Sequence, residues 1–133
     1  MTSYTMRVVT PLPFEEAVAG VHEALSEQGF GVLTEIDVQA TMKKKLDIDV
    51  PAQVILGACR PELAHRAMSA APSISALLPC NVVVRASDEG TVVETIDPDA
   101  MSQLEDQPAI AAVATEARTR LRAALDRMAL QEA

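Results

Sequence analysis

The hydrophobic period changes several times along the chain, and this feature constrains the fold more than any other. Residues 4–9 alternate between apolar and polar side chains, which is typical of a strand. Residues 13–28 carry apolar side chains at helical spacing, with Pro13 at the first position and Gly29 as a stop signal. The same analysis of the whole chain gives the order β-α-β-β-α-β-β-α. The other expected elements are strands at 30–38, 53–59, 77–87 and 90–97, minor helical turns at 40–46 and 98–104, and helices at 61–71 and 108–130.

This order of elements predicts an α+β fold, a two-layer sandwich whose helices gather on one face of a mixed, mostly antiparallel sheet. Its first six elements match the split β-α-β pattern of ferredoxin-like folds. A chain of 133 residues has the usual size of one domain, and this one shows no linker or repeat. We therefore expect a single domain over residues 1–133.

The second strand shows a clear alternation of apolar and acidic residues. Such a pattern predicts one buried face and one face in contact with water. Paired carboxylates can carry out acid–base chemistry, but the alternation alone explains this pair. The expected faces are Phe30, Val32, Ile36 and Val38 on one side, and Glu35 and Asp37 on the other.

Aromatic residues are scarce, which affects both the core and the range of partners. They are Tyr4, Phe14 and Phe30, so the core has to be aliphatic. The lack of stacking surfaces and the net charge of −8 both argue against binding of nucleic acid. No apolar run is long enough to span a membrane, and the first ten residues show no secretory signal. We expect a cytoplasmic protein with reduced thiols, no membrane contact and no cofactor.

Cys59 is the first candidate for chemistry, as a catalytic or ligand-binding residue. It ends a predicted strand two residues before Pro61, which begins a helix. A helix N-terminus stabilises a thiolate and lowers its pKa, and the neighbouring Arg60 acts in the same direction. The alternative is a small buried residue at a strand end, since unpaired cysteines are often buried. Both interpretations stay open at this stage.

Cys80 follows Pro79 at the start of the next strand, and burial is again the simpler interpretation. Because a helix connects the two strands, we expect them to run parallel. The Cα atoms of Cys59 and Cys80 would then be about 15 Å apart, well beyond the roughly 7 Å limit for a disulfide. We therefore expect neither a disulfide within one chain nor a shared metal site, unless a second chain contributes.

The remaining candidate ligand-binding residues are polar side chains near these cysteines and in one basic run. His65 lies on the helix after Cys59, near the edge of its apolar side, and its spacing matches no strong zinc signature. The run Lys43 to Lys45 is either a solvated surface, partly neutralised by nearby aspartates, or a pocket for a phosphate or carboxylate. The complete candidate set is Cys59, Arg60, His65, Cys80, Asn81, Lys43 and Lys45.

Four segments in this order resemble the family catalogued as domain of unknown function 302. They are "GFGVLTEIDVQATMKKKL" (29–46), "ILGACRPELAHRAM" (55–68), "LLPCNVVVR" (77–85) and "IDP" (96–98), and the resemblance covers roughly residues 5–102. It implies a small α+β domain, often a dimer, with no settled activity and no agreed catalytic residues.

Within that family, this chain resembles a cysteine-bearing branch with Cys59 and Cys80 at the two positions concerned. It departs from the family motif at Arg60, where asparagine is more common and would be a good helix N-cap. Either the helix has lost its cap, or Arg60 is placed to meet something anionic.

These observations lead to three hypotheses about function. The first is a non-catalytic, homodimeric module that binds a small ligand, such as an anion, or simply assembles. The second is a thiol-dependent function at Cys59, such as sulfur transfer or redox sensing, assisted by Arg60 and His65. The third is metal binding by Cys59, His65 and Cys80 across a dimer interface. Because the chain shows no phosphate loop, nucleophile elbow or Ser-His-Asp set, its enzymatic status stays open.

Overall fold

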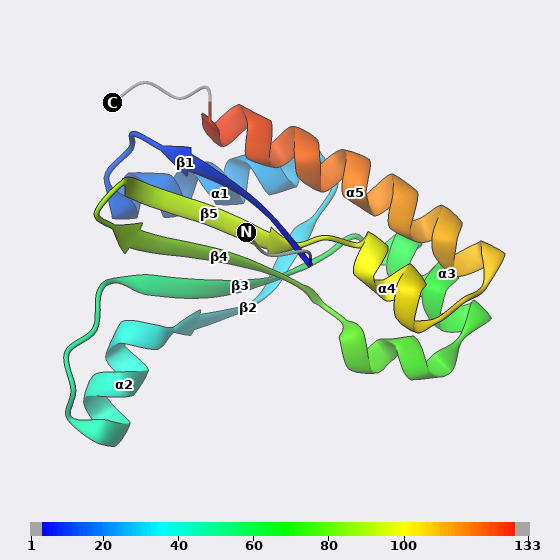
Figure 1. Cartoon of the computed structure of the whole chain (residues 1–133), viewed down its shortest axis with the longest axis horizontal. Coiled ribbons are helices and arrows are strands. Elements are labelled where there is room, and N and C mark those ends of the chain that lie inside the picture. Colours follow the sequence, from blue (N-terminus) through cyan, green and yellow to red (C-terminus); the bar gives the residue numbers. More distant parts are fainter. Residues whose placement is uncertain (1–3, 130–133) are drawn as a thin grey trace.

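The fold is an α+β sandwich built on one five-stranded sheet (Figure 1). The structure, a computed structural model, describes residues 4–129. The strands lie in the order β1-β5-β4-β3-β2, and every neighbouring pair is antiparallel. The elements are β1 (Thr5–Thr10), α1 (Phe14–Glu27), β2 (Gly31–Asp37), α2 (Val38–Leu46), β3 (Gln53–Cys59), α3 (Pro61–Ala70), the 3-10 helix η1 (Pro72–Leu77), β4 (Cys80–Ser87), β5 (Gly90–Ile96), α4 (Asp99–Leu104) and α5 (Pro108–Ala129).

Most of the elements expected from the sequence are present, and the predicted α+β class is confirmed. The hairpin turn lies where expected, with Ser87 paired to Gly90. Residues 1–3 of the expected domain and residue 130 of the expected last helix lie outside the described residues. Within the described part of the chain, no helix combines the length and the apolar character that crossing a membrane requires.

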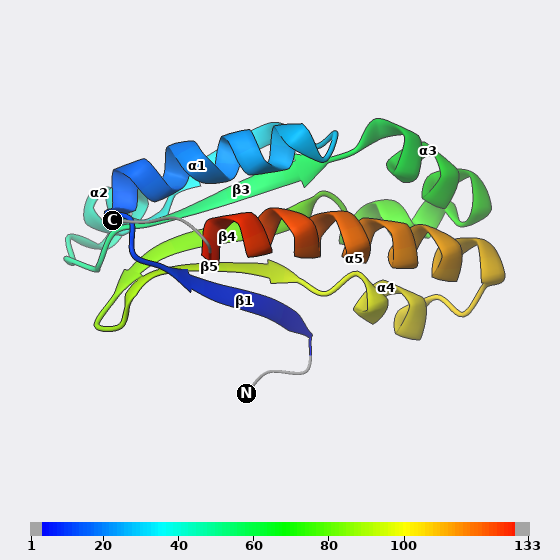
Figure 2. The same cartoon turned by 90° about the horizontal axis from the view of Figure 1, so that it is seen from above.

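The main core lies between the sheet and the pair α1 and α5, which run side by side along one of its faces (Figure 2). It is almost entirely aliphatic, as the composition requires, and Phe30 is its one fully buried aromatic residue among those described. Burial of such side chains supplies most of the favourable free energy of folding. Its most completely buried large side chains include Val21, Leu25, Leu56, Val82, Val84, Leu121 and Met128.

A second core lies beyond the end of the sheet, where α3, η1 and α4 pack around the first half of α5. Leu63 of α3, Ile74 of η1 and Met101 of α4 meet Ile110 and Val113 of α5 there. The second half of α5 belongs to the main core, so this single helix of 22 residues joins the two cores.

The expected parallel arrangement of β3 and β4 is wrong, and the sheet is antiparallel rather than mixed. Gln53 pairs with Arg85 and Ala58 pairs with Cys80, so β4 runs back along β3. The reason is the position of α3 and η1, which pack on α5 beyond the sheet and return the chain to the end that it left. The ferredoxin-like pattern is also wrong, because β5 and β4 separate β1 from β3.

The alternation predicted for the second strand is broken by a β-bulge. The register shifts between Val32 and Thr34, which leaves Leu33 as the extra residue. Phe30 and Val32 therefore pack into the main core, whereas Ile36 is 49% exposed on the opposite face. The expectation that all the apolar residues of this strand share one face is wrong for this reason.

Two glycines provide a test of close packing in this fold. A Cβ atom at Gly57 of β3 would lie 2.2 Å from Thr34 Oγ1 and 2.8 Å from Pro79 Cγ, so both neighbours would have to shift. We predict that Gly57→Ala lowers the free energy of unfolding by about 1–3 kcal/mol, measured by urea denaturation.

Gly20→Ala is the matched control. At Gly20 of α1 the added Cβ would meet the flexible end of Met128, at 3.0 Å from Cε. Alanine also favours a helix over glycine by about 0.5–1 kcal/mol, so this variant should stay within about 1 kcal/mol of the native protein. Equal losses in the two variants would contradict the packing of Gly57 against Thr34.

Candidate functional site

The two cysteines lie together at one end of the sheet. Cys80 is the first residue of β4 and pairs with Ala58, so Cys59 is its diagonal neighbour. Both residues line the same cavity, whose volume is about 30 Å³. The expected separation of about 15 Å is therefore wrong, because it assumed parallel strands. Apolar side chains form most of the remaining wall, among them Phe30, Leu63, Ala67, Pro79, Met101 and Val113.

Both thiols are protonated at neutral pH. Burial, together with a smaller effect of the nearby Cys59, raises the pKa of Cys80 to about 11. Burial also raises the pKa of Cys59, which is only partly exposed. The N-terminus of α3 and the charge of Arg60 do not bring the pKa of Cys59 below its usual value. The structure therefore gives no support for an acidified thiol at Cys59.

Arg60 is held by groups of the protein itself. Its Nε donates a hydrogen bond to the carbonyl oxygen of Gln28 at 3.2 Å, and its Nη1 forms an ion pair with Glu62. The guanidinium also lies over Gly29, whose φ of +80° favours glycine, and a Cβ there would stand 2.9 Å from Nε. Arg60 makes no side-chain cap on α3. The helix has thus lost its cap, and the arginine joins the α1–β2 turn to the thiol cavity.

Two other predicted site residues lie away from the cavity. His65 is exposed on α3 and does not line the cavity. Asn81 is exposed on β4, one residue beyond Cys80, and alternation directs it to the opposite face. In residues 4–129, no group of three or more histidine, cysteine or acidic side chains is placed to hold a metal ion. Of the predicted set, the structure brings together Cys59, Arg60 and Cys80.

The basic run lies on α2, at the far end of β3 from the thiols (Figure 1). Lys43 Nζ lies 3.1 Å from Asp47 Oδ1 and 3.5 Å from Asp49 Oδ1, which confirms the expected local neutralisation. Lys45 is exposed on the same helix. These lysines cannot assist chemistry at Cys59.

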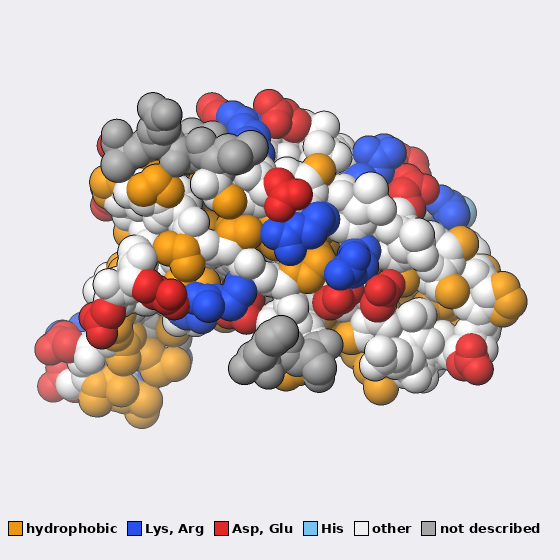
Figure 3. Space-filling view, turned by 45° about the horizontal axis from the view of Figure 1, so that its top comes forward, with side chains coloured by type: hydrophobic (Ala, Val, Ile, Leu, Met, Phe, Trp, Pro, Cys, Tyr) orange, Lys and Arg blue, Asp and Glu red, His pale blue; other side chains and the backbone are white. Residues whose placement is uncertain are grey.

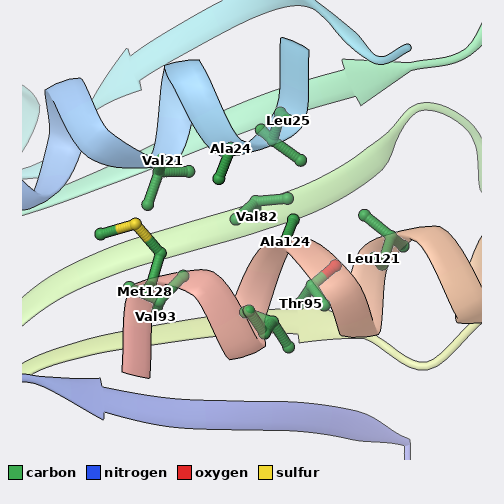
Figure 4. A pocket seen from close by; sticks show the side chains of 10 residues that line it. Val21, Ala24, Leu25, Val82, Val93, Thr95, Leu121, Ala124 and Met128 are labelled. Atoms are coloured by element: carbon green, nitrogen blue, oxygen red, sulfur yellow. The ribbon is translucent and has the colours of Figure 1, made fainter. Parts of the chain in front are cut away.

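A second cavity, between α1, α5 and the sheet, is a packing gap in the main core (Figure 4). Its volume of about 10 Å³ is close to the minimum for one water molecule. The side chains of Val21, Leu25, Val82 and Met128 surround it. It offers no polar group that could orient a ligand except Thr95, whose hydroxyl donates to the carbonyl oxygen of Asn81.

The uncovered face of the sheet is charged over β1, β5 and β4. Glu94 accepts hydrogen bonds from Thr5 Oγ1 at 2.6 Å and from Arg85 Nη1 at 2.7 Å. Burial alone would raise the pKa of Glu94, but these two donors and the positive charges of Arg85 and Arg7 hold it below its usual value. Arg7 also pairs with Glu89 at 2.5 Å. This part of the face satisfies its own charges.

The edge strand β2 and the helix α2 carry exposed apolar side chains. None of the residues 31–49, which we call the β2–α2 arm, is buried. The α2 part of the arm projects from the edge of the sheet (Figure 1), and hydrophobic side chains gather there (Figure 3). Its exposed apolar side chains are Leu33 at 67%, Ile36 at 49%, Leu46 at 62% and Ile48 at 45%.

A signal for this surface was present in the sequence. Leu33 breaks the alternation of the second strand, and Leu46 and Ile48 lie among charged residues of a short polar helix. Ile36 of the arm pairs with Ile55 of β3, and Ile55 pairs with Val83 of β4. These three residues make an apolar row across three strands of the uncovered face.

The comparisons with known proteins identify relatives without an assigned activity. A family model described as "Domain of unknown function DUF302" matches residues 6–128, and so includes most of α5. A crystal structure titled as an uncharacterised conserved protein DUF302 from Bacillus stearothermophilus is similar over 96% of this chain and 99% of that chain. The two share 27% sequence identity with a TM-score of 0.88. No curated protein matches this chain. A cysteine-bearing branch of the family stays a prediction.

Burial of Cys80 makes a prediction about stability at high pH. The thiol ionises near pH 9.0 in the unfolded chain and near pH 11 in the folded protein. Its contribution to the free energy of unfolding is therefore fully present below pH 9 and is lost as the pH rises to 11. We predict a loss of roughly 2–3 kcal/mol over this interval from this group. Denaturation midpoints at several pH values measure it.

Cys80→Ala is the control for the other groups that ionise in this interval, because they are common to both proteins. The variant should show a shallower fall in stability between pH 9 and pH 11. Parallel curves for the two proteins would contradict the burial of a neutral thiol at Cys80.

Proposed function

We propose that this chain, which belongs to the DUF302 family, is a homodimeric assembly module whose two copies join through the β2–α2 arm. The observation that carries this proposal is a stretch of 19 residues, 31–49, that comprises β2, α2 and the three residues after α2 and contains no buried residue. The role is structural and needs no catalytic residue.

The stability of α2 supports a covering partner. The helix has nine residues and buries none of them. Isolated helices shorter than about 12–15 residues are marginal in water, and most helices in proteins depend on packing of an apolar face. In the single chain, α2 relies on local bonds, including the capping hydrogen bond that the amide of Ala40 donates to Asp37 Oδ1 at 2.9 Å. A partner over Leu46 and Ile48 would supply the missing burial.

The position of β2 supports a symmetric contact. It is the edge strand of the sheet, so one side of its backbone has no neighbouring strand. Edge strands with exposed apolar residues tend to pair with another chain. Two copies related by a twofold axis could place their β2 strands or arms against each other, since such an axis brings the same patch of both subunits together.

The charges of the arm make it complementary to itself. It carries the basic run Lys43 to Lys45 and the acidic residues Glu35, Asp37, Asp47 and Asp49. Lys43 pairs with Asp47 and Asp49 of its own arm, but in a twofold contact Lys44 and Lys45 of one arm can face acidic residues of the other, and complementary charges steer association. A strongly charged partner of one sign would match only half of the arm, which favours a second copy as the occupant.

The size of the thiol cavity argues for assembly rather than for binding of a small molecule there. Sites for small molecules have volumes of about 300–1,000 Å³. The cavity beside Cys59 and Cys80 has a volume of about 30 Å³, which suits one or two water molecules. A small organic ligand would require this cavity to open, so assembly is better supported than binding of a small molecule at the thiols.

The proposal predicts a dimer that depends on the arm. Sedimentation velocity at micromolar concentration should give twice the chain mass of 14.2 kDa for the native protein. Leu46→Glu should shift this to a monomer, because it places a charge in the apolar contact. The helical content by circular dichroism should change little, since Leu46 is 62% exposed.

Leu104→Glu provides a matched control. Leu104 is 73% exposed on α4, away from the arm, and the substitution makes the same change in charge. This variant should remain a dimer. A native protein that sediments as a monomer, or a Leu46→Glu variant that remains a dimer, would overturn the proposal.

A further inference from the structure

The antiparallel register of β3 and β4 brings two thiols close together, which allows a chemical activity that does not depend on dimerisation. We propose that Cys59 and Cys80 form a reversible disulfide within one chain, which makes them a thiol redox pair. Directly paired residues of antiparallel strands have Cα atoms about 4.5–5.5 Å apart, and one step along a strand adds about 3.4 Å at a right angle. Diagonal neighbours such as these two are thus about 6 Å apart, within the usual 4.4–6.8 Å for a disulfide.

The bond requires the side chain of Cys59 to turn towards Cys80 at the end of the strand. In a regular strand, Cys59 would point away from the face that Ala58 occupies. However, β3 ends at Cys59, and Cys59 and Cys80 are both among the residues that line one cavity. Electrostatic coupling between the two thiols is strong enough to contribute to the raised pKa of Cys80.

The difference in exposure assigns a separate step to each cysteine. Cys59 is partly exposed and Cys80 is buried, so the oxidant reaches Cys59 first. With a low-molecular-weight disulfide as the oxidant, the Cys59 thiolate attacks one of its sulfur atoms, the S–S bond breaks, and one thiolate leaves. Cys80 then loses its proton to solvent and attacks Cys59 Sγ, and the second small thiol leaves. Two protein thiols are oxidised, and one small disulfide is reduced to two thiols.

The cavity favours the second step over a lasting mixed disulfide. With a volume of about 30 Å³, it has no room for a bound tripeptide thiol. The small thiol of the mixed disulfide therefore stays at the surface until Cys80 displaces it from Cys59. Arg60 is the one charged side chain among the described residues that line the cavity, and Glu62 and Gln28 engage its guanidinium. Neither thiol is activated by a base, so oxidation is slow at neutral pH and faster at alkaline pH.

The bond would have a definite structural effect. It would close a loop over residues 60–79, which contains α3 and η1, and would fasten the second core to the end of the sheet. A crosslink of this kind restricts the unfolded chain and so stabilises the fold. Oxidation should therefore raise the denaturation midpoint, and reduction with a small thiol should restore the original value.

Intact-mass spectrometry of the native protein tests the inference. After incubation with oxidised glutathione at pH 8, the mass should fall by two hydrogen atoms, both thiols should be lost from a titration in denaturant, and a digest should contain the peptide pair linked through Cys59 and Cys80. Added dithiothreitol should reverse all three changes.

Two variants test the order of the steps. Cys80→Ser should stop at one glutathionyl adduct on Cys59, because the resolving thiol is gone. Cys59→Ser should acquire an adduct more slowly, because Cys80 is buried. A native protein that accumulates the Cys59 adduct, or a disulfide between two chains, without the internal bond would overturn the inference. The Leu46→Glu variant should form the same bond, which separates this result from the outcome for the dimer.

Discussion

The antiparallel ladder between β3 and β4 determines the arrangement of the rest of the molecule. Both strands are interior strands of the sheet, and their residues Leu56, Val82 and Val84 are buried in the main core. The same ladder fixes the ends of both strands. Because Ala58 is opposite Cys80, the last residue of one strand and the first residue of the other bring two thiols to one cavity.

Helix α5 makes this arrangement possible, because it supports both ends of the ladder. Its first half packs with α3, η1 and α4, which occupy the space beyond the sheet. Its second half, including Leu121 and Met128, packs on the sheet beside α1. The chain between β3 and β4 can therefore bury its own apolar side chains without crossing the sheet, and it returns to begin an antiparallel strand.

The sequence predicts the elements well, because local periodicity and the proline and glycine positions are strong signals in this chain. It does not predict the direction of β4. A helix between two strands usually makes a parallel crossover, and nothing in the pattern of residues 61–77 shows that this segment packs on α5 instead. The sequence also does not predict the bulge at Leu33. An apolar residue that breaks the alternation does not show whether one residue is inserted into the strand.

The candidate site was predicted in part. Cys59, Cys80 and Arg60 lie together, whereas His65, Asn81 and the lysines do not, since their positions depend on the register and on which way each element faces. Arg60 illustrates the limit of local rules: it is a poor helix cap, but it binds the carbonyl oxygen of Gln28, which is distant in the sequence. The exposed arm has a signal in the sequence, but the exposure of Leu46 and Ile48 follows from the tertiary fold and cannot be predicted from that signal alone.

The most direct test of this account is a measurement of the β3–β4 register in solution by NMR. Nuclear Overhauser contacts between backbone protons should connect Ala58 with Cys80 at one end of the ladder and Gln53 with Arg85 at the other. Contacts that instead connect Gln53 with Cys80 would show parallel strands, would separate the two thiols, and would contradict the account.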